Sequence, residues 1–256
     1  MAERPAPTGL DLLEEALSLV EGARLLGVPL RLVGGLAVRY LTPSLPPRTR
    51  ERQDLDLASV SRSRPQLTEF LVGLGCEADK RFNALYGHKQ LFFSTPEGRA
   101  IDILVDRMEM CHVVEFADRI ERHPVTLDVT DLLLTKLQIV ELNEKDAQDA
   151  LYLVSAFEAK EGDDPGSIGL GRVTAVVADD WGWWRTVSIN LDRIRDLAKV
   201  ERGRLIPVAT AYDPVVQIDT LADAVQTVPK TLRWRLRAKV GERKRWYRVP
   251  DEDSHD

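Results

Sequence analysis

The chain contains few cysteines and no long apolar run. Only Cys76 and Cys111 occur among its 256 residues, and neither belongs to a C-x-x-C pair, so we expect no disulfide framework. No stretch of 18 apolar residues is present, and the N-terminus has no apolar signal core. The four histidines show no ligand spacing. These absences predict a cytoplasmic protein with no membrane partner.

What is present is a folded-protein composition with an uneven charge. The chain is 44% hydrophobic and 30% charged, with a formal net charge of −6. The segment 233–248 opposes this sign, because it contains one acidic residue and eight basic ones: Arg233, Arg235, Arg237, Lys239, Arg243, Lys244, Arg245 and Arg248. Trp234, Trp246 and Tyr247 lie between them, a combination that suits single-stranded nucleic acid. The other interpretation is a solvated helix whose Trp234 packs inward.

The hydrophobic periodicity predicts an α+β core followed by helices. Helical spacing covers residues 11–26, and turn residues join two expected strands, 90–94 and 100–105, into a hairpin. We expect further strands at 30–33, 54–58 and 125–129, and helices at 36–41, 65–74, 130–140, 144–159, 171–180, 183–198 and 219–240. The linker signal at 162–167 divides the chain into a core, 1–162, and a helical C-terminal domain, 163–256, with its basic segment at 233–248.

Three aspartates give the strongest chemical signal. Asp54 and Asp56 are one residue apart on an expected strand, so their carboxylates share a face while Leu55 and Leu57 face the core. Asp102 lies between Ile101 and Ile103 on another expected strand. Neighbouring carboxylates repel each other, and a hard divalent cation such as Mg²⁺ relieves that repulsion. Three together would suit a two-metal site for nucleotidyl transfer.

A glycine pair precedes these aspartates. Gly34 and Gly35 lie between an expected strand and an expected helix. Without side chains, their N–H groups can approach phosphate oxygens at a helix N-terminus. A glycine pair alone is typical of any turn, but the ordered set of strand, glycine pair, helix and two aspartate-bearing strands is more specific.

This ordered set resembles the nucleotidyltransferases of the DNA polymerase beta superfamily. The segment 32–37 (LVGGLA), the segment 52–57 (RQDLDL), Thr135-Lys136-Leu137 and Lys145-Asp146-x-x-Asp149 look most like the AbiE-type toxin nucleotidyltransferases. The resemblance covers roughly residues 10–160. It implies a palm-like mixed sheet with flanking helices and an enzyme that moves NMP from an NTP to a hydroxyl.

The resemblance also implies roles for individual residues. Asp54, Asp56 and Asp102 would be the catalytic residues and would hold two Mg²⁺ ions. Gly34, Gly35, Lys136, Asp149 and Arg52 would bind the nucleotide. The toxin relatives further imply a tRNA acceptor, reached through Arg233, Arg235, Arg237, Lys244 and Arg245, and a cognate antitoxin as partner.

Two other functions stay open at this point. One is adenylylation of a small molecule of the aminoglycoside type, which would leave the basic segment without a role. The other is a non-catalytic member that binds a nucleotide or a partner protein. The base preference, the acceptor, toxin status and oligomeric state do not follow from the sequence.

Overall fold

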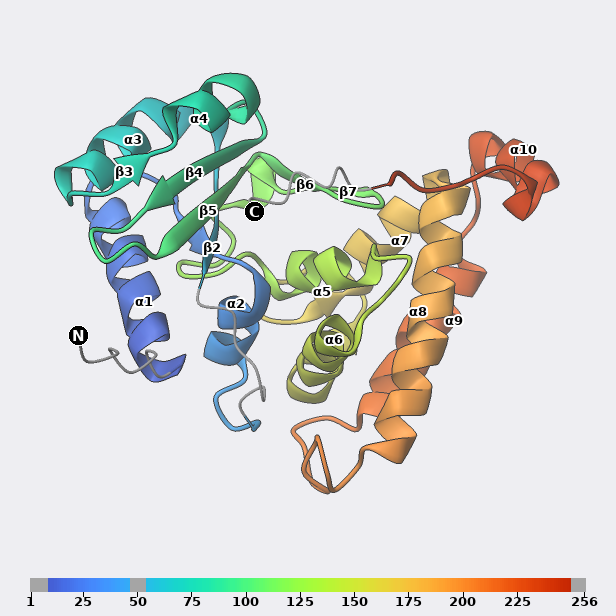
Figure 1. Ribbon diagram of the computed structural model, residues 1–256. Coiled ribbons are helices and arrows are strands. Elements are labelled where there is room, and N and C mark those ends of the chain that lie inside the picture. Colours follow the sequence, from blue (N-terminus) through green and yellow to red (C-terminus); the bar gives the residue numbers. More distant parts are fainter. Residues whose placement is uncertain (1–8, 47–53, 250–256) are drawn as a thin grey trace. The chain divides into compact units, whose positions relative to one another are not determined.

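The computed structural model describes residues 9–46 and 54–249, and these form two compact units (Figure 1). Of the described residues, 9–41, 54–108 and 115–127 belong to the first unit. The second unit contains 42–46, 109–114 and 128–249.

The first unit contains a five-stranded mixed sheet. Its strands are β1 (Arg31–Leu32), β2 (Leu55–Ser59), β3 (Glu77–Ala78), β4 (Gln90–Ser94) and β5 (Ala100–Val105), in the order β1-β2-β5-β4-β3. Only β2 and β5 pair in parallel, and the other neighbours are antiparallel. In β5, alternate residues Ile101, Ile103 and Val105 are buried, as the period of two requires. The α+β class is confirmed, and so is the β4–β5 hairpin, whose turn is closed by Gly98 N donating to Thr95 O.

Four helices flank this sheet: α1 (Gly9–Leu25), α2 (Gly34–Leu41), α3 (Arg64–Gly73) and α4 (Lys80–Tyr86). Helix α1 buries one apolar face, including Leu12, Ala16 and Leu19. Helix α2 packs beside β2 (Figure 1). Short α4 and β3 were not predicted; α4 begins because the Asp79 carboxylate accepts from Phe82 N as an N-cap.

The expected strand at 125–129 is wrong. Only one isolated bridge, between Leu32 and Thr126, forms there. The Asp128 side chain accepts a hydrogen bond from Thr130 N, so Asp128 caps a helix that already begins at Val129. A capping carboxylate therefore ends the extended run before a strand can develop.

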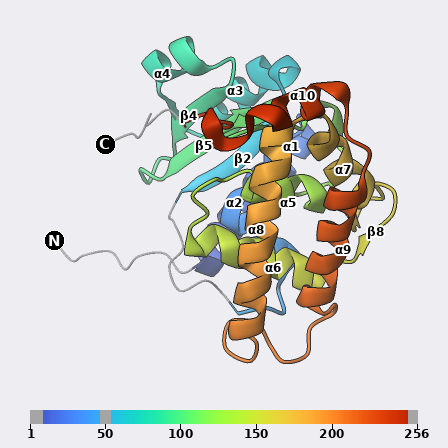
Figure 2. The same ribbon diagram turned by 90° about the vertical axis from the view of Figure 1, so that its right-hand side faces the viewer.

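The second unit is mainly helical. Its helices are α5 (Val129–Leu137), α6 (Glu144–Ala156), α7 (Leu170–Asp179), α8 (Trp181–Val200), α9 (Pro214–Thr227) and α10 (Leu232–Val240). Helix α8 packs against α6, α7 and α9, and Figure 2 shows α8 and α9 side by side. Two short parallel strands, β8 (Ala159–Lys160) and β9 (Ile168–Gly169), pair across the loop at the expected linker. A hairpin of β6 (Arg107–Glu109) and β7 (Val113–Glu115) carries the segment Glu109–Val114.

The units divide at Leu127, whereas the linker signal predicts a division at 162. Helices α5 and α6 pack against α8, which groups them with the C-terminal helices. A glycine- and proline-containing loop marks a turn in the chain, and the packing of apolar helix faces decides which segments form a compact unit.

The expected helix at 219–240 is two helices. Helix α9 ends at Thr227, and Thr231 caps α10 by accepting from Trp234 N. Pro229 lies between them and lacks the N–H that a continuous helix needs. No helix in the described part of the chain is long and apolar enough to cross a membrane.

Candidate functional site

Two of the three predicted carboxylates lie next to each other in the first unit. Asp56 on β2 and Asp102 on β5 are direct partners in the parallel register. Neighbouring strands are about 4.8 Å apart, so side chains at paired positions on one face are neighbours. The residues flanking each aspartate, including Leu55, Leu57 and Ile101, are fully buried on the opposite face. The sheet therefore presents two half-buried carboxylates together.

Gly34 lies against one of these two carboxylates, that of Asp56. It has a φ of +62°, a conformation that favours glycine, and it begins α2. A Cβ built on Gly34 would come 2.7 Å from Asp56 Oδ2. The backbone beside it is anchored as well, because Val33 N donates to Asp56 O at 3.0 Å. The glycine bend, with Gly35 next in the helix, thus meets Asp56 with no side chain between them.

Gln90 is a member of this group that the sequence did not reveal. Its Nε2 donates to Oδ1 and Oδ2 of Asp102 at 2.8 and 2.7 Å. The antiparallel register pairs Phe92 with Asp102, so Gln90 is the diagonal neighbour on the same face. This amide holds the Asp102 carboxylate in one orientation. The alternation along β4 indicates its face, but its partner depends on the register.

The described residues bring together a pair of carboxylates that suits one hard cation, and not the predicted trio for two. Asp54 directly precedes β2, and Arg52 lies outside the described residues. Across 9–46 and 54–249, no three His, Cys, Asp or Glu side chains converge as metal ligands. Mg²⁺ is commonly held by one or two carboxylates, with water and substrate phosphates completing the shell. Asp56 and Asp102 fit that donor set, while the role of Asp54 stays a prediction.

Lys136 and Asp149 lie in the second unit, on α5 and α6. Lys136 Nζ lies 2.7 Å from Asp146 Oδ1 and 2.9 Å from Asp149 Oδ2, and both Lys136 and Asp149 are buried. Burial by itself lowers the pKa of Lys136, but the carboxylates of Asp149 and Asp146 outweigh it and raise that pKa. The ammonium is therefore charged and joins the two helices. Nucleotide binding by Lys136 and Asp149 stays a prediction.

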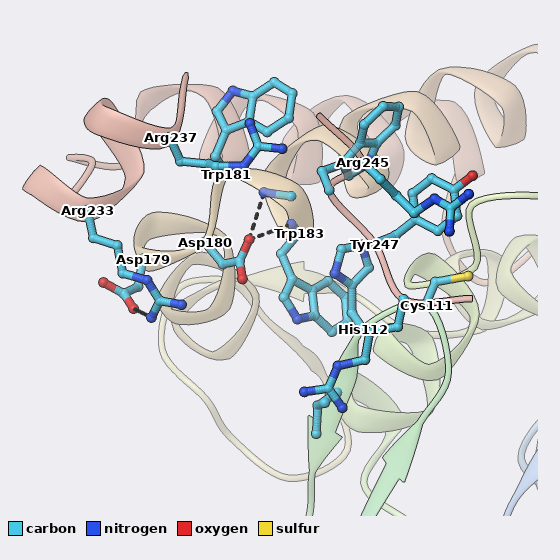
Figure 3. A pocket seen from close by; sticks show the side chains of 14 residues that line it. Cys111, His112, Asp179, Asp180, Trp181, Trp183, Arg233, Arg237, Arg245 and Tyr247 are labelled. Atoms are coloured by element: carbon cyan, nitrogen blue, oxygen red, sulfur yellow. Dashed lines mark hydrogen bonds and ion pairs between the residues drawn. The ribbon is translucent and has the colours of Figure 1, made fainter. Parts of the chain in front are cut away.

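The basic segment contributes to a second site, a cavity of about 660 Å³ within the second unit (Figure 3). Of the residues predicted to meet RNA, Arg233, Arg237 and Arg245 line this cavity, whereas Arg235 and Lys244 do not. Aromatic rings form much of the wall, among them Trp181, Trp183, Trp246 and Tyr247. Trp181 and Trp183 are buried, so they also serve the core packing typical of tryptophan. We call this cavity the arginine–tryptophan pocket.

The chain after α10 forms one wall of the pocket. Arg248 N donates to Cys111 O at 2.9 Å, and Trp246 Nε1 donates to Thr186 Oγ1 at 3.1 Å. The Trp246 carbonyl lies directly against Gly182, where there is no room for an added Cβ. This wall is thus held at the first turns of α8, by Gly182 and Thr186, and at the β6–β7 hairpin, by Cys111.

His112 completes a hydrogen-bonded chain behind this wall. Its Nε2 lies 2.9 Å from Thr186 Oγ1, and its ring stacks on Trp183 with centroids 4.9 Å apart. Burial lowers the pKa of His112 to about 4, opposed by Asp180 and assisted by Arg248. Thr186 Oγ1 accepts a hydrogen bond from Trp246 Nε1, so the Thr186 hydroxyl proton can be donated to Nε2 of a neutral His112. The pocket therefore gains no charge from His112 at neutral pH.

Comparison with known proteins gives only distant similarities. No protein-family model and no curated protein matches the chain. Among solved structures, the antibiotic-resistance factor ANT(2'')-Ia is 13% identical, with 58% of this chain and 85% of that chain aligned at a TM-score of 0.40. An antigenic nucleotidyltransferase-like protein from Paracoccidioides brasiliensis is 16% identical, with 88% and 97% aligned at a TM-score of 0.41. JHP933 from Helicobacter pylori is 12% identical, with 93% and 99% aligned at 0.32. Such values do not define a common fold, so the chemistry has to be inferred from the side chains.

Proposed function

We propose that the first unit is a nucleotidyltransferase centre that moves NMP from an NTP to an acceptor hydroxyl. One observation carries this proposal: the left-handed Gly34, at the start of α2, lies directly against one of two carboxylates paired across parallel strands. A helix N-terminus with exposed backbone N–H groups favours phosphate. Two adjacent carboxylates favour a divalent cation. A triphosphate with its metal needs both features side by side.

In this proposal the residues of the centre bind phosphate, hold the metal and accept the proton of the acceptor. The N–H groups of Gly34 and Gly35 bind phosphate oxygens, and Asp56 and Asp102 hold Mg²⁺, with Asp54 as a further ligand. When bound, the metal neutralises the charge of the triphosphate. The acceptor oxygen forms a bond to the α-phosphorus, the bond to the pyrophosphate oxygen breaks, and Asp102 accepts the hydroxyl proton. Gln90 holds Asp102 in position for this step.

For the acceptor we propose RNA, with tRNA as the first choice. The basic residues of the segment 233–248 and the aromatic rings among them support a polyanion with stackable bases. A cognate antitoxin would be the protein partner of a toxin-type enzyme. Transfer to an aminoglycoside, or nucleotide binding without transfer, are the competing outcomes of the experiment below.

The experiment incubates the protein with each labelled NTP, Mg²⁺ and either total RNA or an aminoglycoside. We expect label on the tRNA fraction. Asp56→Asn should abolish transfer, because an amide oxygen cannot replace the charged ligand. The matched control is Asp118→Asn, which changes the same charge at an exposed position of the first unit. Thermal melting of both variants shows whether each is folded.

Three results would count against the proposal. Turnover by Asp56→Asn equal to that of the wild type would remove the carboxylate pair from catalysis. Label only on the aminoglycoside would show that the acceptor is a small molecule and not RNA, while nucleotidyl transfer itself would still hold. Binding of NTP with no transfer to any acceptor would show that the centre is a nucleotide-binding site alone.

A further inference from the structure

The arginine–tryptophan pocket combines positive charge with aromatic walls. Four arginines line it, with Asp179 and Asp180 as the acidic lining residues. Its volume of about 660 Å³ lies within the range of roughly 300–1,000 Å³ that is usual for small-molecule sites. Charge together with aromatic surface is the combination that binds phosphate and base at once.

Most of the arginines already have partners. Arg233 pairs with Asp179 at 3.1 Å, and Arg248 lies 3.7 Å from Glu109. Arg237 donates to the carbonyls of Gly241 and Lys244 and lies over the Trp181 ring, so it supports the wall.

Arg245 differs from the other three. Its guanidinium lies 5.8 Å from the centroid of the Tyr247 ring, and no carboxylate in the described part of the chain pairs with it. Arg245 is exposed and Tyr247 is half-buried, so both are accessible from the pocket (Figure 3). A guanidinium that lies near an aromatic ring and has no carboxylate partner can bind a phosphate, while the ring is available to stack on a planar base.

The helix N-terminus in the pocket is not the anion site. The Asp180 carboxylate accepts from Gly182 N at 2.7 Å and from Trp183 N at 3.2 Å, which satisfies the first N–H groups of α8. His112 is neutral, as its lowered pKa requires. Recognition of an anion therefore depends on the arginines, and above all on Arg245, whose positive charge is not paired with a carboxylate of the described residues.

We propose that this pocket binds a nucleoside phosphate unit, with its phosphate on Arg245 and its base against the Tyr247 and Trp246 rings. The unit is either a free nucleotide or one unstacked nucleotide of a single RNA strand. The RNA case rests on the proposed function, since it makes the pocket a docking point for the acceptor. A duplex should not bind in this way, because its bases are stacked within the double helix and cannot reach the aromatic rings of the pocket.

The experiment measures binding of a fluorescein-labelled U8 RNA by anisotropy, with UMP and a DNA duplex as competitors. Neither NTP nor Mg²⁺ is added, so binding is observed apart from transfer. Arg245→Gln should weaken U8 binding about tenfold and reduce the slope of log K against log salt by about 0.7. The matched control is Arg243→Gln. Arg243 is two residues from Arg245 and carries the same charge, but its side chain does not line the pocket. That variant should change binding by less than about twofold.

Tyr247→Leu tests the stacking contact without changing charge. We expect binding to weaken by about fivefold or more, the range for losing one base–aromatic stack. Competition by UMP would identify the free nucleotide as a ligand, and U8 binding that UMP does not displace would identify the strand; both support the pocket. The Asp56→Asn variant should bind U8 as the wild type does, so a failure of the proposed catalysis leaves this result unaffected.

The proposal is overturned by any of three results. Equal weakening of binding by Arg245→Gln and Arg243→Gln would show only diffuse attraction to a basic surface. The duplex could compete as well as U8, which would exclude base stacking. Absence of U8 binding would remove the site, because U8 contains the nucleoside phosphate unit that the pocket is proposed to bind.

Discussion

Replacing Gly34 by alanine tests the contact on which the proposed centre depends. A non-glycine residue at positive φ costs roughly 1–2 kcal/mol. The new methyl group would also lie 2.7 Å from Asp56 Oδ2, and overpacking of this kind costs about 1–3 kcal/mol unless the carboxylate turns away. Gly34→Ala should therefore lower the free energy of unfolding by about 2–5 kcal/mol, measured by urea denaturation followed by circular dichroism. If Asp56 turns instead, part of this loss appears as lost nucleotidyl transfer.

Two glycines of the same unit separate these effects. Gly27 has a φ of +70° and no atom within 4 Å of an added Cβ, so Gly27→Ala measures the backbone strain alone. Gly73 has neither strain nor a close neighbour and ends α3, so Gly73→Ala should be neutral or gain up to about 1 kcal/mol. A Gly34→Ala protein with the stability of Gly27→Ala and undiminished transfer would refute the reasoning.

Three further predictions concern the second unit. Lys136→Met deprives the buried Asp149 of its ammonium and should cost about 3–5 kcal/mol in urea denaturation, whereas Lys145→Met, at an exposed position nearby, should stay within about 0.5 kcal/mol. The pKa of His112 is near 4 in the folded protein and 6.5 in the unfolded chain, so on acidification the unfolded chain is protonated first. The contribution of neutral His112 to the free energy of unfolding is therefore complete above pH 6.5 and is lost as the pH falls toward 4. Between pH 7 and pH 4.5 the wild type should lose about 2–3 kcal/mol more than His112→Gln, and equal losses would contradict the assignment. Thr186→Val removes the acceptor of Trp246 Nε1 and the partner of His112, and should cost about 1–3 kcal/mol in denaturation and weaken U8 binding; unchanged binding with reduced stability would show that the wall does not depend on this bond.

Local sequence signals predicted the elements of the first unit except for the short α4 and β3. Alternation located β4 and β5 at their observed bounds, and the turn chemistry between them predicted their hairpin. These features depend on neighbours within a few residues, and so a single sequence contains them. Where a capping side chain or a proline competed with periodicity, as at Asp128 and Pro229, the competing residue decided the outcome.

The pairing of distant residues could not be read in the same way. The sequence indicated that Asp56 and Asp102 lie on strands, but only the parallel register of β2 and β5 makes them neighbours. The same register assigns Gln90 to Asp102, and a shift by one residue would turn that side chain to the other face.

For this protein the chain alone determined which residue types carry charge, where the glycine bend falls and where most of the helices and strands lie, since these follow from composition and local periodicity. Tertiary structure decided that Lys136 is enclosed by two carboxylates, that Gly34 touches Asp56, and that Arg245 and Tyr247 meet at one pocket with Cys111 and His112. The physical reason is that burial and close approach depend on segments far apart in sequence, whose contacts form only when apolar faces pack together.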